Sequence, residues 1–236
     1  MQGEKMAFSK KVKSEVEDYC NNHLAKDCWY ENEFSFIKDK SLKKSIIEEF
    51  KAIRFAYKLY EGIGATKENL RFEVRNQILA YASIYEVVID YVLKNYYLET
   101  KEYDDLTHYH ALKRISIPQT KQSTLQKELS HDGKKIIPTY YGRKKKSDCQ
   151  ITFEAKCKTA KKLGLIHNFT SKEGEEIDFA KELIEIYKHR NGIHIMAEKK
   201  NGIKYESELE LSKKAYRRMQ PFIKQIKDKL LEDKKI

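Results

Sequence analysis

A long apolar segment that begins after Thr66 and continues to about Tyr97 most constrains the fold of this chain. Its apolar residues recur at helical spacing and cover more than one face of the helix: Ile78, Leu79, Ala82, Ile84, Tyr85, Val88, Ile89 and Val92. A helix that is apolar over much of its circumference is buried by its neighbours. The sequence therefore predicts a central, largely buried helix here, with Thr66 as its N-cap.

The same helical spacing recurs elsewhere in the chain. It predicts further helices over residues 8–24, 42–62, 152–163, 175–190 and 209–231, with Ser41 as the N-cap of the second, and a polar loop over 27–39 that holds Trp29. Only 9 Gly and 3 Pro occur in 236 residues, too few for a fold with many tight turns. We therefore expect an all-α fold, a bundle of long, mostly antiparallel helices.

Two acidic residues, Glu86 and Asp90, lie among the apolar residues of the predicted central helix. They are either buried acids with partners or the solvent-facing edge of that helix. The sequence leaves both alternatives open.

The helical pattern breaks between Leu98 and Gln150, where Pro118 and Pro138 interrupt it and 123–129 is the one short helix expected. We expect one domain over 1–236, with 1–65 as a helical N-terminal extension and 99–150 as a basic insertion. Within the insertion, the basic run from Arg143 to Lys146 is expected at the tip of a β-hairpin or an exposed loop.

Positive charge is concentrated in and just after this insertion. The chain has a net charge of +11, and between Lys113 and Lys162 there are 14 basic and 4 acidic residues. Basic residues interleaved with aromatic ones favour nucleic acid, which is held through its phosphates and by stacking of its bases. The candidate RNA-binding residues are Lys134, Lys135, Tyr141, Arg143, Lys144, Lys145 and Lys146. An acidic protein partner is the alternative.

The run His189-Arg190-Asn191-Gly192-Ile193-His194-Ile195 closes the helix predicted before it. Residues four apart lie on one face of a continuing helix, so Arg190 and His194 are expected to project together. A guanidinium beside an imidazole suits a phosphodiester, because one grips its oxygens and the other moves a proton. Alternatively, Asn191 and Gly192 form a C-terminal turn, and Arg190 only complements the helix dipole.

This run, with the preceding 153–166 and the apolar helix 71–97, resembles the HEPN superfamily of helical ribonucleases and RNA-binding domains. The likeness covers about 66–98 and 151–232. Members carry an Arg, usually followed by a polar residue, and a His a few residues later. Three residues separate Arg190 from His194, where the family usually has four to six, and Gly192 is expected to let the helix distort.

The resemblance implies a metal-independent endoribonuclease that acts as a homodimer, with two Arg/His motifs in one composite cleft. It implies that His194 moves the 2′-hydroxyl proton or stabilises the leaving group, that Arg190 holds the scissile phosphate, and that Asn191 orients the backbone or a phosphate oxygen. His189 is a weaker candidate. The products would be a 2′,3′-cyclic phosphate and a 5′-hydroxyl.

Other chemistry lacks support in the sequence. Cys20, Cys28, Cys149 and Cys157 do not have zinc-finger spacing, and no phosphate loop or Ser/His/Asp set is present. His108 and His110 are the one weak metal hypothesis. We expect no metal or cofactor, no membrane partner and, from the absence of a signal peptide, a cytoplasmic location with reduced thiols.

The leading hypothesis is therefore a HEPN-type ribonuclease acting on RNA such as tRNA or mRNA, in the role of a toxin or antiviral defence effector. An antitoxin or other regulatory protein is a possible partner under this hypothesis. Two alternatives remain. One is a non-catalytic RNA-binding helical module, and the other is an interaction protein that docks an acidic partner through its basic insertion.

Overall fold

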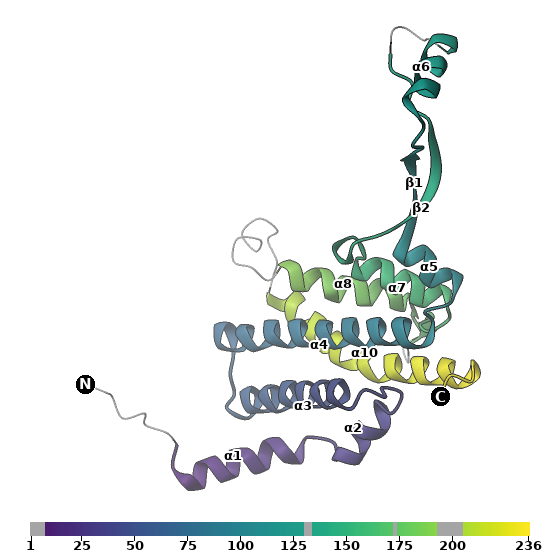
Figure 1. The fold of residues 1–236 in the computed structure, drawn as a ribbon. Coiled ribbons are helices and arrows are strands. Elements are labelled where there is room, and N and C mark those ends of the chain that lie inside the picture. The colour runs from purple at the N-terminus through teal and green to yellow at the C-terminus, as the bar shows by residue number, and fades with distance from the viewer. Residues whose placement is uncertain (1–7, 130–133, 172–173, 193–204) are drawn as a thin grey trace. The chain divides into compact units, whose positions relative to one another are not determined.

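The computed structural model describes residues 8–129, 134–171, 174–192 and 205–236. They form two compact units, one made of Met1–Leu98 with Phe153–Ile236 and the other of Glu99–Thr152. The described residues are mostly helical (Figure 1). They also include two short antiparallel strand pairs. The helical character expected from the sequence is confirmed.

The first unit is built around α4 (Lys67–Tyr96), which packs against α3, α7, α8 and α10. Its residues are buried on several faces, and those with no exposed surface are Val74, Ile78, Tyr81, Tyr85, Val88 and Val92. This is the central helix that the apolar pattern predicts. Thr66 is its N-cap, as expected, although the Thr66 side chain makes no capping hydrogen bond.

The N-terminal part of this unit contains α1 (Lys10–Asn22), α2 (Asp27–Glu33) and α3 (Lys40–Gly62). The predicted loop around Trp29 is wrong, because these residues form α2, whose Tyr30 ring packs edge-on against Phe50 of α3 at 5.6 Å. Tertiary packing of this kind stabilises a helix too short to form alone. The predicted cap of α3 is also wrong, since Asp39 rather than Ser41 accepts the bond from the Leu42 amide at 2.9 Å.

The C-terminal part contains α7 (Phe153–Lys162), α8 (Phe179–Gly192) and α10 (Tyr205–Glu232). Helix α8 starts later than predicted, because the residues just before it form β4 (Glu176–Ile177), which pairs with β3 (Phe169–Thr170). Helix α10 starts earlier than predicted. It contains Pro221 and remains a helix through that residue.

The second unit contains α5 (Lys101–Thr107), β1 (His108–Arg114), α6 (Gln119–Glu128), β2 (Thr139–Lys145) and a 3₁₀ turn, η1 (Asp148–Gln150). Strands β1 and β2 form an antiparallel ribbon in which His108 pairs with Lys145 and Arg114 with Thr139. A hairpin element is therefore present, but its predicted tip is wrong. The residues Arg143–Lys145 lie in the strand itself, because β2 pairs with the distant segment 108–114.

Candidate functional site

Arg190 lies in the last described turn of α8 and is held by the central helix. Its Nη1 donates to Glu86 Oε2 of α4 at 2.8 Å, and the Tyr187 hydroxyl donates to Glu86 Oε1 at 3.1 Å. The Arg190 side chain keeps 32% of its surface exposed, and that of Glu86 keeps 28%. The guanidinium is thus positioned by a carboxylate and still reachable by a ligand.

Two of the three predicted catalytic side chains are not described. His194 lies outside the described residues, and Asn191 is placed in α8 only as backbone. The structure therefore brings Arg190 together with Glu86 and Tyr187, and the predicted pairing of Arg190 with His194 stays a prediction.

An aromatic pair supports the Arg190 position. The Phe153 ring of α7 stacks on the Tyr187 ring with centroids 4.3 Å apart, and the Arg190 guanidinium lies 5.3 Å from the Tyr187 centroid. Burial, followed by the nearby Glu86 charge, raises the pKa of Tyr187. The phenol therefore stays protonated at neutral pH and serves as a hydrogen-bond donor rather than a base.

The second acidic residue of the central helix, Asp90, is paired with lysines. Asp90, one turn after Glu86, contacts Lys94 at 2.6 Å and Lys156 of α7 at 2.8 Å. Burial raises the pKa of Asp90, and the two ammonium groups outweigh that effect and lower it overall. Of the two alternatives for Glu86 and Asp90, the structure supports partly buried acids with partners.

His189 belongs to a different cluster. Its Nε2 lies 3.8 Å from Glu208 Oε1 of α10, a carboxylate that is 1% exposed and is bound by Arg71 Nε at 2.8 Å and Arg75 Nε at 2.9 Å. Burial lowers the pKa of His189 despite the Glu208 charge, so the imidazole is neutral at pH 7. His189 therefore serves the packing of α4, α8 and α10, away from Glu86.

Sequence reasoning missed the Glu208 cluster. Arg71 and Arg75 lie four residues apart, a spacing that places both on one face of α4. That spacing was the available signal, but their partner lies 133 residues beyond Arg75 in the chain.

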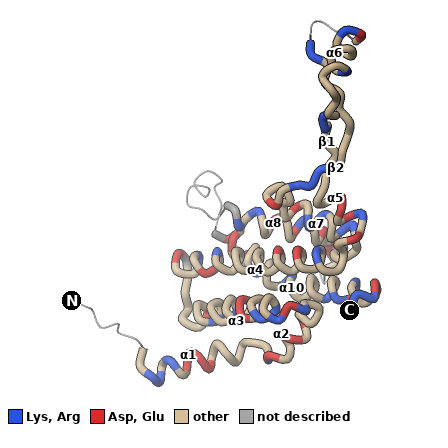
Figure 2. Tube along the Cα trace, in the orientation of Figure 1, with Lys and Arg blue, Asp and Glu red and all other residues tan. Residues whose placement is uncertain are grey.

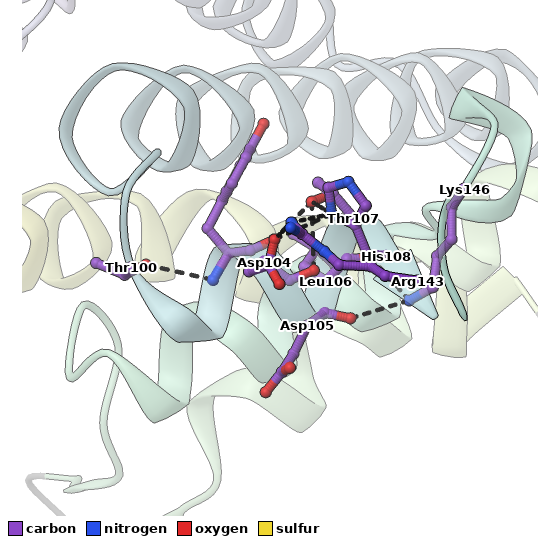
Figure 3. Close-up of polar contacts among 9 residues, drawn as sticks. Thr100, Asp104, Asp105, Leu106, Thr107, His108, Arg143 and Lys146 are labelled. Atoms are coloured by element: carbon purple, nitrogen blue, oxygen red, sulfur yellow. Dashed lines mark hydrogen bonds and ion pairs between the residues drawn. The ribbon is translucent and has the colours of Figure 1, made fainter. Parts of the chain in front are cut away.

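The basic run of the second unit divides into anchored and exposed residues, and the anchored ones are drawn in Figure 3. Arg143 pairs with the Asp104 carboxylate, and its Nη2 lies 3.1 Å from His108 Nδ1. Lys146 Nζ donates to the carbonyl oxygens of Leu106 at 2.8 Å and Asp105 at 3.1 Å, at the C-terminal end of α5. Arg143 and Lys146 thus tie β2 to α5.

Lys144 and Lys145 are exposed, and no ion pair of either is found in the described part of the chain. Side chains alternate across a strand, so these two lysines face opposite sides of the ribbon. Tyr141 is 73% exposed and shares the face of Lys145, and Lys134 and Lys135 are exposed where the chain enters β2. Lys and Arg recur along β1, β2 and α6 (Figure 2). The ribbon thus presents cations and a phenol ring to solvent.

Metal and membrane hypotheses find no added support. No cluster of three or more His, Cys, Asp or Glu side chains suited to a metal ion occurs in residues 8–129, 134–171, 174–192 and 205–236. His108 is instead engaged by Asp104, at 3.1 Å, and by Arg143. Among the described helices, none has both the length and the apolar character needed to cross a bilayer.

Comparison of this chain with models of known families, with curated proteins and with solved structures finds no significant match. Function must therefore be inferred from the residues themselves. Among the described residues, the predicted site residues leave cationic side chains accessible to a ligand and in a defined geometry at the Arg190 turn and on the β1–β2 ribbon.

Proposed function

We propose that this protein is a metal-independent endoribonuclease that cleaves RNA at Arg190 and His194. The observation that carries the proposal is the Arg190 guanidinium, fixed by Glu86 and Tyr187 and about one third exposed. A guanidinium fixed before its ligand arrives stabilises developing phosphate charge at little reorganisation cost. In the sequence, His194 follows four residues after Arg190.

In the proposed reaction the 2′-oxygen attacks the adjacent phosphorus and the bond from phosphorus to the 5′-oxygen breaks. The 2′-hydroxyl proton is taken up, and a proton is delivered to the departing 5′-oxygen. His194 performs one of these proton transfers, Arg190 binds the non-bridging oxygens, and Asn191 orients the backbone or a phosphate oxygen. The products are a 2′,3′-cyclic phosphate and a 5′-hydroxyl.

The remaining parts of this proposal rest on the HEPN resemblance. Two protomers would bring their Arg190/His194 motifs together across a two-fold axis, and the cellular role would be that of a toxin or antiviral effector. An antitoxin or other regulatory protein would restrain the activity. The β1–β2 ribbon would hold the RNA through Lys144, Lys145 and Tyr141.

Cleavage of tRNA and total RNA in the presence of EDTA tests the proposal. Wild type is compared with Arg190→Ala, His194→Ala and, as a matched control, Lys181→Ala, which removes an exposed cation from the same helix. We expect cleavage by wild type and Lys181→Ala, and losses of at least about 100-fold in the other two variants. Equal cleavage by all four proteins would overturn the assignment.

One observation favours a second candidate, a non-catalytic RNA-binding module. Glu86 compensates the charge of Arg190, which weakens attraction for a phosphate, whereas Lys144 and Lys145 carry exposed charge. This candidate predicts salt-sensitive RNA binding by all four proteins and cleavage by none.

A further inference from the structure

A cleft of about 1140 Å³ lies in the first unit, away from the Arg190 turn. Its walls come from the end of α1, the start of α2 and the connection between them, from α3, from the β3–β4 pair and from α10. Pockets for drug-sized ligands measure roughly 300–1,000 Å³, so this cleft has room for more than one small planar group. The proposed function leaves it without a role.

Aromatic rings line this cleft. Trp29, the only tryptophan of the chain, is partly exposed and is braced edge-on by Tyr30 at 5.0 Å. Tyr216 of α10 is 39% exposed, and the Arg54 guanidinium of α3 covers its ring at 3.9 Å from the centroid. Rings and guanidinium planes held in this way are surfaces on which nucleic-acid bases stack.

Arginines stand beside these rings. Arg218 is neutralised, because it forms a two-bond pair with Glu182 at 2.6 and 3.3 Å. For Arg54 and the exposed Arg217, by contrast, no ion pair is found within the described residues. Glu210, whose pKa Arg217 helps to lower, is already bound to Lys213 at 2.8 Å. Glu175 is the acidic residue among those lining the cleft, so cationic character prevails there.

Pro221 removes a backbone donor beside Arg217. It lies inside α10 and lines the cleft together with Arg217. Proline has no amide hydrogen, so it cannot donate the usual helical bond to the carbonyl oxygen four residues earlier, which is that of Arg217. The Arg217 carbonyl oxygen therefore lacks this helical donor.

We propose that this cleft binds nucleotides of single-stranded RNA. The bases stack on Trp29 and on the pair formed by Tyr216 and Arg54, and Arg217 binds a phosphate. Stacking surfaces together with a cation match a base and its phosphate better than an acidic peptide, which would leave the rings without planar partners. The inference rests on the proposed function, because that function makes RNA, and not free nucleotides, the source of the bound bases.

Trp29 itself provides the measurement, because tryptophan fluorescence is quenched when a base stacks on the ring. The full chain is titrated with a four-residue 2′-O-methyl oligoadenylate, which cannot be cleaved through its 2′-oxygen, and in parallel with AMP and with a tetraglutamate peptide. The variants are Arg217→Ala and, as a matched control on the same helix, Lys224→Ala, whose lysine is exposed and does not line the cleft.

We expect saturable quenching by the oligonucleotide, weaker quenching by AMP, and no response to the peptide. Loss of one charge-assisted phosphate contact should weaken binding about tenfold in Arg217→Ala, with Lys224→Ala like wild type. No quenching by either nucleotide, equal affinities in the two variants, or a stronger response to the peptide would each overturn the proposal. The ribonuclease proposal is judged separately, by cleavage in Arg190→Ala and His194→Ala, so either can fail alone.

Discussion

The guanidinium of Arg190 on α8 donates to the carboxylate of Glu86 on α4 across 2.8 Å, although 104 residues separate them in the chain. The pair joins the last described turn of α8 to the central helix. It also sets where the cation of the proposed active site lies. Several of the following predictions concern charge pairs of this kind, because each has a neighbour that serves as a control.

Removing Glu86 should impair RNA cleavage more than folding. In Glu86→Ala, Arg190 loses its orienting carboxylate, and we expect kcat for cleavage to fall about tenfold, while a partly exposed pair contributes about 1 kcal/mol or less to stability. Asp90→Ala, one turn along α4, also removes a carboxylate paired with cations, in this case Lys94 and Lys156, but leaves Arg190 untouched. Equal kcat values for the two variants, measured with RNA in EDTA, would contradict this role of Glu86.

The salt dependence of RNA affinity should show that the exposed lysines of the ribbon contact phosphates and that an exposed lysine elsewhere does not. Each phosphate contact to single-stranded RNA contributes about 0.7 to the slope of log affinity against log salt. We expect the double variant Lys144→Ala/Lys145→Ala to lower this slope by about 1.4. Lys40→Ala, an exposed lysine at the start of α3, should leave it unchanged. An unchanged slope in the double variant would rule out RNA contacts by these lysines.

Lys146 should matter for the stability of the second unit. Its ammonium donates to two carbonyl oxygens at the end of α5, and losing such bonds costs about 1–3 kcal/mol. In Lys146→Ala we expect the amides of the β1–β2 ladder to exchange hydrogen at least about fivefold faster. Lys145→Ala, on the adjacent exposed position, is the control for this mass-spectrometric measurement, and the same acceleration in both variants would refute the anchoring role.

Substitution of the buried Glu208 should lower the free energy of unfolding more than substitution of most other charged residues. Its removal in Glu208→Ala leaves Arg71 and Arg75 without this carboxylate, and breaking a buried pair costs about 3–5 kcal/mol. Glu210→Ala removes an exposed acid from the same helix and should change stability by about 0.5 kcal/mol or less. Urea unfolding of both variants tests this, and a loss below 1 kcal/mol for Glu208→Ala would contradict the burial.

His189 makes stability depend on pH. Burial lowers its pKa below the ordinary histidine value of 6.5, so the unfolded chain binds the proton more readily than the folded one. The folded state is therefore favoured above pH 6.5 and loses stability as pH falls from 6.5 through the lowered folded value. The unfolding free energy of wild type should decline over this range more than that of His189→Gln. Parallel pH profiles of the two proteins would show that His189 does not cause the decline.

Much of the fold was predictable because its signals are local. The apolar residues of 67–96 mark a helix buried on several faces, and Gly164, with φ of 75°, ends α7 where the sequence predicts. Two of the failures share one cause. Helix α2 and the pairing of β2 with β1 depend on partners distant in the chain, such as Phe50 for Tyr30, and local spacing carries no record of them. Strand β4 pairs with β3 only a few residues earlier, and two-residue strands are too short to show an alternating pattern.

The candidate site was predictable only in part, for the same reason. Arg190 and the run Arg143–Lys146 stand out in the sequence by residue type. Nothing local distinguishes Arg143 and Lys146, which are anchored to α5, from Lys144 and Lys145, which are exposed. The cleft beside Trp29 was not foreseen, since its walls come from four separate parts of the chain.

The sequence by itself determined the helical class, the central position of α4 and the concentration of positive charge between Lys113 and Lys162, because helical periodicity and charge are properties of neighbouring residues. Only the tertiary structure decided which charged groups are neutralised and which remain available to a ligand. Glu86 compensates Arg190 and Glu208 compensates Arg75 across more than 100 residues. The strength of an ion pair depends on distance in space and on burial, which the order of residues does not specify.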